Sequence, residues 1–184
     1  MRVIAGKARR INLVSPPGLD VRPTQDRIKE TLFNILQDDI PGCRFLDLFA
    51  GSGGIGIEAL SRGAGHASFV ERDKKALSCI KENLAKTKLS DDATVYAMDV
   101  MAALGGYMSD GGAYDIIFAD PPYHAGYEER LVQALSVSSA VGPDTLVIIE
   151  AALETDMEFL DDSCFEIYRI KDYKSNRHIF IKKK

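Results

Sequence analysis

Residues 45–60 read FLDLFAGSGGIGIEAL, and this stretch decides the fold of the chain. It begins as a short apolar run, which is typical of a strand that is buried on both faces of a parallel sheet. A glycine-rich turn follows, and Ile55, Ala59 and Leu60 then fall on one face of a helix. A strand, a glycine turn and a helix in this order predict one half of a nucleotide-binding βαβ unit.

The glycines of the turn are compatible with more than one ligand. Gly51, Gly53 and Gly56 match the G-x-G-x-x-G pattern of dinucleotide-binding proteins, although glycines here can also serve only to pack a helix closely on a sheet. Asp47 ends the strand and is expected to point into the turn, where its carboxylate would repel a pyrophosphate. S-adenosylmethionine carries a sulfonium and an ammonium and has no phosphate, so we predict that it is the cofactor.

Length and composition predict a single domain over residues 1–184. The hydrophobic fraction is 46% and the charged fraction is 27%, which is ordinary for a soluble protein. No run approaches the roughly 20 apolar residues of a membrane span, and the N-terminus has no apolar signal-peptide core. Cys43, Cys79 and Cys164 are far apart and odd in number, which argues against disulfides or a zinc site and favours a reducing cytoplasm.

The charge of the chain is unevenly distributed. The net charge is −4, but residues 1–30 carry +4 and residues 169–184 carry +6, which leaves −14 for the residues between them. Basic ends on an acidic body predict a polyanion-binding face where the two ends meet, and the alternative is a pair of solvated surfaces. The basic side chains that we assign to this face are Arg2, Lys7, Arg9, Arg10, Arg22 and Arg177.

An N-terminal extension, residues 1–42, is expected before the nucleotide-binding unit. Residues 2–5 and 8–13 predict the two strands of a β-hairpin. Thr24 is a suitable N-cap for a helix with an apolar stripe, which ends before the Pro-Gly pair at residues 41 and 42.

The core, residues 43–184, alternates strands and helices as a doubly wound α/β sheet should. The C-terminal part of the core breaks this order of strands and helices. A strand-like alternating pattern at residues 165–173 and 178–182 predicts an antiparallel hairpin there. The other strands are expected at residues 67–71, 93–97, 114–119 and 145–150. Helices are expected at residues 54–61 and 127–138, with a short one around Leu104. A further helix should begin after a cap at Asp73 and run to about Lys86.

Acidic residues end three successive strands of this core. Asp47, Glu71 and Asp99 should meet at one edge, because ligands bind at the carboxyl ends of the strands in open α/β sheets. Glu71 could accept both ribose hydroxyls of a nucleoside, and Asp99 could reach the adenine edge or be only a helix cap. The predicted cofactor-binding residues are Asp47, Phe49, Ala50, Gly51, Ser52, Gly53, Glu71, Arg72, Asp99, Val100 and Asp120.

The motif Asp120-Pro121-Pro122-Tyr123 follows the strand at 114–119. Its two prolines fix φ and remove two backbone donors, so the Asp120 carboxylate and the Pro121 carbonyl remain as acceptors. Such a pair suits the two N–H groups of an exocyclic amine, and Tyr123 offers a ring on which a flipped base can stack. We assign these four residues to catalysis; the alternative is a rigid turn with a surface tyrosine.

The motifs at 47–53, DLFAGSG, and at 120–123, DPPY, resemble those of class I S-adenosylmethionine-dependent amino-methyltransferases. Residues 2–6, RVIAG, and residues 22–24 and 30–34, RPT and ETLFN, are similar to the bacterial RsmD family, which methylates the N2 amine of a guanine in small-subunit ribosomal RNA. The resemblance covers essentially the whole chain, although residues 173–181 match only loosely.

This resemblance implies a Rossmann-like fold with a seven-stranded, mostly parallel sheet and a C-terminal antiparallel hairpin. It implies that Asp47, Gly51, Glu71 and Asp99 contact S-adenosyl-L-methionine and that residues 120–123 hold the guanine. It also implies that the partner is 16S ribosomal RNA, within the small subunit or an assembly intermediate. We further expect a cytoplasmic monomer whose basic ends hold the RNA backbone.

Other functions remain open at this point. A DNA adenine-N6 methyltransferase uses the same motif, but this chain has no room for a target-recognition domain. A protein glutamine methyltransferase usually carries Asn in place of Asp120, and a nicotinamide-dependent oxidoreductase would leave residues 120–123 unexplained. An RNA-binding module without catalysis is a further alternative. His66, His124 and His178 are scattered, so we predict no metal.

Overall fold

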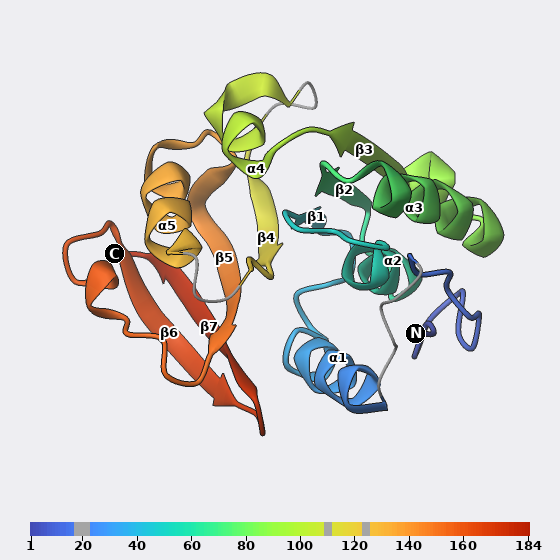
Figure 1. Ribbon diagram of the computed structural model, residues 1–184, viewed down its shortest axis with the longest axis horizontal. Coiled ribbons are helices and arrows are strands. Elements are labelled where there is room, and N and C mark those ends of the chain that lie inside the picture. Colours follow the sequence, from blue (N-terminus) through green and yellow to red (C-terminus); the bar gives the residue numbers. More distant parts are fainter. Residues whose placement is uncertain (17–22, 109–111, 123–125) are drawn as a thin grey trace. The chain divides into compact units, whose positions relative to one another are not determined.

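The structure is a computed structural model that describes residues 1–16, 23–108, 112–122 and 126–184. These residues form two compact units, Met1–Met98 and Asp99–Lys184 (Figure 1). Each unit combines β-strands with helices, as the sequence predicts for an α/β protein. No helix within the described ranges is long and apolar enough to cross a membrane.

Three parallel strands form the sheet of the first unit, in the order β3-β2-β1. Their bounds, with those of the helices that connect them, are β1 Arg44–Asp47, α2 Gly54–Ser61, β2 His66–Glu71, α3 Lys74–Thr87, the short 3-10 helix η1 Ser90–Asp92, and β3 Ala93–Ala97. Phe45, Leu46, Phe69 and Val70 are fully buried, which explains why β1 and β2 read as apolar runs. The predicted strand–turn–helix unit is confirmed.

Glycines shape the turn between β1 and α2. Gly51 and Gly53 have φ values of 53° and 81°, which side chains rarely allow. At Gly56, an added Cβ would lie 2.3 Å from Cε1 of Phe69 in β2, so this glycine lets α2 approach the sheet. The next helix, α3, begins as predicted, because the Asp73 side chain accepts the N–H groups of the first turn.

The N-terminal segment, residues 1–14, does not form the predicted two-stranded hairpin. It contains one isolated antiparallel bridge, between Arg2 and Asn12. The Val3 N–H donates to the Ile11 carbonyl at 3.0 Å, so the chain reverses direction without regular strands.

Helix α2 takes the backbone groups that a regular hairpin would use. The N–H groups of Ile4 and Ala5 donate to the carboxylate of Glu58, at 2.8 and 3.0 Å. The N–H of Ala8 donates to the hydroxyl of Ser61 at 3.0 Å. Because these partners lie more than 50 residues away, the pattern of residues 2–13 alone cannot reveal them.

Helix α1 (Pro23–Ile35) follows this segment. It already includes Pro23, so the prediction that Thr24 is its N-cap is wrong. Proline suits the first helical position, because its φ is already helical and the N–H of that position has no partner in the helix. Leu32 and Phe33 are fully buried.

The second unit contains a mixed sheet in the order β4-β5-β7-β6. Strands β4 and β5 are parallel, and β6 and β7 form the predicted antiparallel hairpin. The elements are α4 Val100–Ala102, the π-helical turn η2 Ala103–Tyr107, β4 Tyr114–Ala119, α5 Tyr127–Val137, β5 Val141–Ala152, the short 3-10 helix η3 Glu158–Leu160, β6 Phe165–Asp172 and β7 Asn176–Lys183.

Strand β5 is longer than the predicted residues 145–150. Val141 already pairs with Tyr114, and a register shift follows before the regular ladder with β4 resumes at Leu146. The hydroxyl of Thr145 donates to the Tyr114 carbonyl at 2.6 Å and accepts the Gly142 N–H at 2.8 Å. These bonds hold the irregular part of the strand in the sheet.

Strand β6 is the last strand of this sheet and pairs with β7. Its exposed side chains include Ile167, Tyr168 and Ile170. The ammonium of Lys182 in β7 lies 4.5 Å from the ring centroid of Tyr168, at a distance that allows a cation–π contact.

Candidate functional site

Asp47 lies at the end of β1, as predicted, and is buried, with 1% of its surface exposed. Its Oδ2 accepts the N–H of Gly56 at 3.0 Å. Burial raises the pKa of Asp47 to about 7, and the charge of Glu71 adds to this effect, while the bond from Gly56 opposes it. The two carboxylates predicted from the ends of β1 and β2 therefore lie near enough to interact.

Glu71 ties the glycine turn to the end of β2. Its Oε2 accepts the N–H of Gly51 at 2.8 Å. Its Oε1 accepts the N–H groups of Arg72 and Asp73, both at 2.8 Å. A carboxylate oxygen accepts up to two hydrogen bonds, so Oε2 can receive a hydroxyl in addition to the Gly51 N–H.

Backbone hydrogen bonds also hold the turn. The Ala50 N–H donates to the Val70 carbonyl at 3.1 Å, and the Gly53 N–H donates to the Ala50 carbonyl at 2.7 Å. Ala50, Ser52 and Gly53 are buried, whereas Gly51 and Phe49 are partly exposed. An added Cβ at Gly51 would meet nothing within 4 Å, so the backbone of the turn is open at this residue.

This donor and acceptor set fits a cationic nucleoside. Two carboxylates, Asp47 and Glu71, face a turn whose backbone is open at Gly51. A sulfonium and a ribose hydroxyl complement such a site, while a pyrophosphate would be repelled by Glu71 and, above the pKa of about 7, also by Asp47. The residues of the first unit thus suit S-adenosylmethionine better than a dinucleotide.

The second unit contains the remaining predicted site residues. The Asp99 side chain accepts the N–H of Met101 at 2.9 Å, so the helix-cap role that the sequence left open is present. Val100 is buried. Contact of Asp99 with an adenine stays a prediction.

Asp120 and Pro122, directly after β4, are exposed, and Pro121 is buried. Ala119, the last residue of β4, pairs with Ile149 in the parallel ladder, so Asp120 follows β4 at the level of Glu150, which lies within β5. Tyr123 lies outside the described residues, and so does His124.

A buried polar chain in the second unit was missed by the sequence prediction. His178 in β7 has 1% of its surface exposed. Its Nε2 lies 3.1 Å from Oε2 of Glu150, and its Nδ1 lies 3.2 Å from the Tyr173 hydroxyl. Asn176 donates to the other oxygen of Glu150. Burial and the charge of Glu150 raise the pKa of Tyr173 to about 12.

The pairing of β5 with β7 brings this chain together. Glu150 lies opposite His178 in the antiparallel ladder, so their side chains emerge on the same face. The alternating pattern of residues 178–182 could have indicated that His178 lies on one face of a strand. The register of the hairpin on β5 was not available from the sequence.

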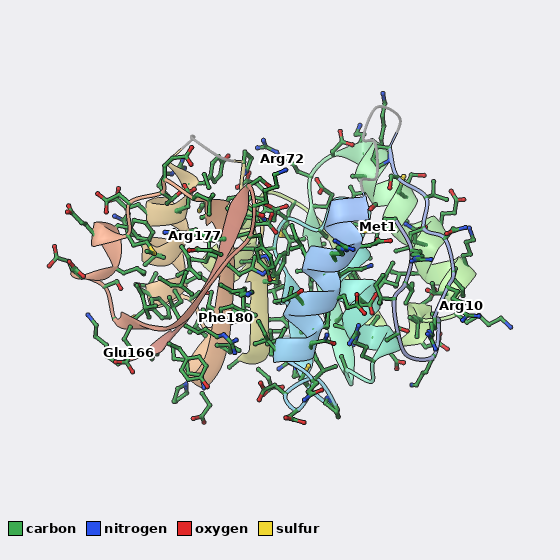
Figure 2. All side chains as sticks on the ribbon, turned by 90° about the horizontal axis from the view of Figure 1, so that it is seen from below. Met1, Arg10, Arg72, Glu166, Arg177 and Phe180 are labelled. Carbon is green, nitrogen blue, oxygen red and sulfur yellow. The ribbon has the colours of Figure 1, made fainter. Side chains whose placement is uncertain are left out.

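The predicted basic residues differ in their surroundings. Lys7, Arg9 and Arg10 are exposed on the N-terminal segment, and Figure 2 shows Arg10 extending away from it. Arg2 is also exposed and lies 3.3 Å from a carboxylate oxygen of Asp26.

Arg177 is less accessible than the N-terminal cations. Its side chain is 18% exposed, and its Nε lies 3.0 Å from Oδ1 of Asp172 without hydrogen-bond geometry. Arg22 lies outside the described residues. A common face for the two basic ends of the chain stays a prediction. Among the described residues, no group of three or more His, Cys, Asp and Glu side chains could hold a metal.

Comparisons with known proteins agree with these features. A family model described as Conserved hypothetical protein 95 matches residues 1–182. The Ribosomal RNA small subunit methyltransferase D of Escherichia coli (strain K12) is 35% identical over 157 residues, covering 85% of this chain and 77% of that protein. A provisionally assigned rRNA methyltransferase of Bacillus subtilis (strain 168) is 39% identical over 157 residues, covering 85% of each.

A solved structure gives the same fold. An Escherichia coli chain described as a provisionally assigned methyltransferase aligns with a TM-score of 0.83 and 31% identity, covering 100% of this chain and 98% of that one. The predicted Rossmann-like methyltransferase fold is thereby confirmed.

Proposed function

Because the chain belongs to the RsmD family, whose model is described as Conserved hypothetical protein 95, we propose that it is an S-adenosyl-L-methionine-dependent methyltransferase of ribosomal RNA. Its target is the exocyclic N2 amine of a guanine in the 16S RNA of the small subunit, in keeping with its Escherichia coli relative, a small subunit methyltransferase. It acts as a monomer in the cytoplasm, on the small subunit or an assembly intermediate.

One observation supports the cofactor most directly: the pair of carboxylates at the glycine turn. Glu71 receives one ribose hydroxyl on Oε2 while it keeps the N–H of Gly51. Burial raises the pKa of Asp47 to about 7, and the positive sulfonium favours the ionised form of its carboxyl group. Phe49, Ala50 and the turn glycines form the wall against which the nucleoside rests. When bound, the cofactor supplies an activated methyl group.

The target amine needs acceptors, because its lone pair is delocalised into the guanine ring. Asp120 follows a buried strand and is exposed, and Pro121 is buried. The Asp120 carboxylate and the Pro121 carbonyl orient the two N–H groups, and methyl transfer then proceeds mainly through positioning. Orientation by Asp120 outweighs its action as a base, because a carboxylate is a weak base; it can accept the leaving proton late in the reaction.

RNA is recognised by charge and by base flipping. The guanine must leave its stack to reach Asp120, and Tyr123 offers a stacking partner. The exposed Lys7, Arg9 and Arg10 hold the phosphate backbone, which makes binding sensitive to salt.

The deciding experiment is methylation in vitro. Small subunits from a strain that lacks the modification are incubated with the protein and a tritiated methyl donor, and the product nucleoside is identified by digestion and mass spectrometry. We expect one N2-methylguanosine in the 16S RNA. Labelling of an adenine, of DNA or of a ribosomal protein would overturn the proposed target, and no labelling of any of these would overturn the activity.

A further inference from the structure

Asn83 in α3 joins the N-terminal segment to the glycine turn. Its side chain is fully buried. Its Oδ1 accepts the Val14 N–H at 2.7 Å, while its Nδ2 donates to the Val14 carbonyl and to the Ser52 carbonyl, both at 2.9 Å. The amide thereby makes three hydrogen bonds, and one of them fixes the carbonyl at the centre of the turn.

The N-terminal segment also reaches the turn at its other end. An added Cβ at Gly54 would lie 2.3 Å from Sδ of Met1, so the first side chain of the protein covers the first residue of α2. Between Met1 and Val14, the segment packs closely on α2. An added Cβ at Gly6 would lie 1.8 Å from the Ser61 carbonyl oxygen, which shows how closely the backbones approach.

Different side chains form hydrogen bonds to the backbone at different residues of the turn. Glu71 holds Gly51 through its N–H, and Asp47 holds Gly56 through its N–H. The Ser52 carbonyl accepts a hydrogen bond from Asn83. A buried amide is costly unless its groups are paired, so a residue needed only for packing would be better served by an apolar side chain.

We propose that Asn83 is a positioning residue for the cofactor-binding turn, and that the N-terminal segment belongs to the cofactor site through Val14. Asn83 does not contact the cofactor; it holds the Ser52 backbone while Val14 holds Asn83. The proposal rests on the proposed function, because it takes the turn to be the site of S-adenosylmethionine.

Asn83→Ala and Ser61→Ala form a matched pair for the test. Both remove side-chain bonds to the N-terminal segment, because Ser61 accepts the Ala8 N–H and donates to the Ala5 carbonyl at 2.6 Å. Only Asn83→Ala also frees the Ser52 carbonyl. We expect the Kd and KM for S-adenosylmethionine to rise about tenfold in Asn83→Ala, with kcat at saturating cofactor within about twofold of the wild type. Both constants should stay within about twofold in Ser61→Ala.

A second measurement needs no variant. In the wild-type protein, S-adenosylmethionine should slow amide hydrogen exchange at Val14 together with Gly51 and Gly53, and leave exchange at Ala8 unchanged. If Asn83→Ala does not fold, this measurement alone tests whether the N-terminal segment belongs to the cofactor site.

Three results would overturn the proposal. These are unchanged cofactor affinity in Asn83→Ala, an equal loss in Ser61→Ala, and unchanged exchange at Val14 when the turn is protected. Each leaves the proposed function intact, provided that the wild type binds the cofactor. A wild-type protein that binds none would overturn the proposed function itself, and with it this role of Asn83.

Discussion

The carboxylate of Glu71 accepts the backbone N–H of Gly51 at 2.8 Å, across 20 residues of sequence. The same carboxylate also accepts the N–H groups of Arg72 and Asp73. One side chain therefore shapes the turn after β1 and the start of the segment after β2. A substitution at Glu71 changes both the shape and the charge of the proposed cofactor site.

Glu71→Ala should weaken the binding of S-adenosylmethionine by roughly 1.5–3 kcal/mol, the scale of a hydrogen bond to a charged group. Isothermal titration calorimetry measures this loss directly. The wild type should bind S-adenosylmethionine and no nicotinamide dinucleotide. Equal or tighter binding of NAD would contradict the assignment of the turn.

Asp47 should make stability depend on pH. Burial raises its pKa from 3.8 to about 7 in the folded protein, so between these values the folded state binds a proton that the unfolded state has lost. The free energy of unfolding should therefore fall as pH rises from about 4 to about 7, by roughly 1.4 kcal/mol per pH unit at most, and then level off.

Asp47→Asn is the control for this effect, because it removes the titrating group and keeps an oxygen to accept the Gly56 N–H. Denaturant unfolding at a series of pH values should show that the variant lacks the decline of the wild type. Parallel curves for the two proteins would mean that Asp47 is ionised throughout this range.

Asp120→Ala should fold normally, because the side chain is exposed, and should still bind cofactor, because Asp47 and Glu71 are untouched. Methyl transfer should fall by roughly 10²–10³, the scale of losing one preorganised hydrogen-bonding group. Single-turnover methylation of small subunits that lack the mark gives the rate. Tyr123→Phe should be tolerated, because stacking needs only the ring. If Asp120→Ala keeps most of the wild-type rate, the amine is held elsewhere.

The double variant Arg9→Ala/Arg10→Ala should bind RNA more weakly, whatever the nucleotide sequence of the RNA. Both side chains are exposed on the N-terminal segment. The slope of log affinity against log salt should shrink by up to about one unit per lost phosphate contact. Filter binding at several salt concentrations measures this slope, and cofactor affinity should not change. An unchanged slope would remove these arginines from the RNA-binding face.

Glu58→Ala should be among the most destabilising single changes. Glu58 is fully buried, accepts two N–H groups of the N-terminal segment, and lies 3.2 Å from the buried ammonium of Lys29 and 2.8 Å from Nε of Arg62. Removing it leaves Lys29 buried without this partner, and burial already lowers the pKa of that amine. The free energy of unfolding should fall by roughly 3–5 kcal/mol.

A matched control for this change is the exposed Glu129, whose replacement by alanine should alter stability by about 0.5 kcal/mol or less. Chemical denaturation of the two variants makes the comparison. Similar losses in both would mean that the ion pairs around Glu58 contribute little.

Local patterns predicted the parts of the fold that depend on local interactions. The unit β1–α2, the capped start of α3, and the bounds of β3 and β4 follow from apolar runs, glycine spacing and one N-cap. The positions of Asp47 and Glu71, the proposed cofactor carboxylates, were predicted because acidic residues coincide with strand ends in the sequence. Each of these features involves residues close together in the chain.

Long-range partners account for what was not predicted. The hairpin at residues 2–13 failed because Glu58 and Ser61 take its backbone donors. The Glu150–His178 pair and the bridging role of Asn83 depend on strand register and on the path of the N-terminal segment. No pattern within a single element contains that information.

The exposed edge of β6 has a consequence for solubility rather than for catalysis. Among the described strands β6 pairs with β7 alone, and an edge strand with exposed Ile167, Tyr168 and Ile170 can add a strand from another molecule. Arg169 and Lys171, in the same strand, place like charges on any two edges that approach each other. These cations act as gatekeepers against self-association, so neutralising them would favour aggregation of the folded protein at high concentration.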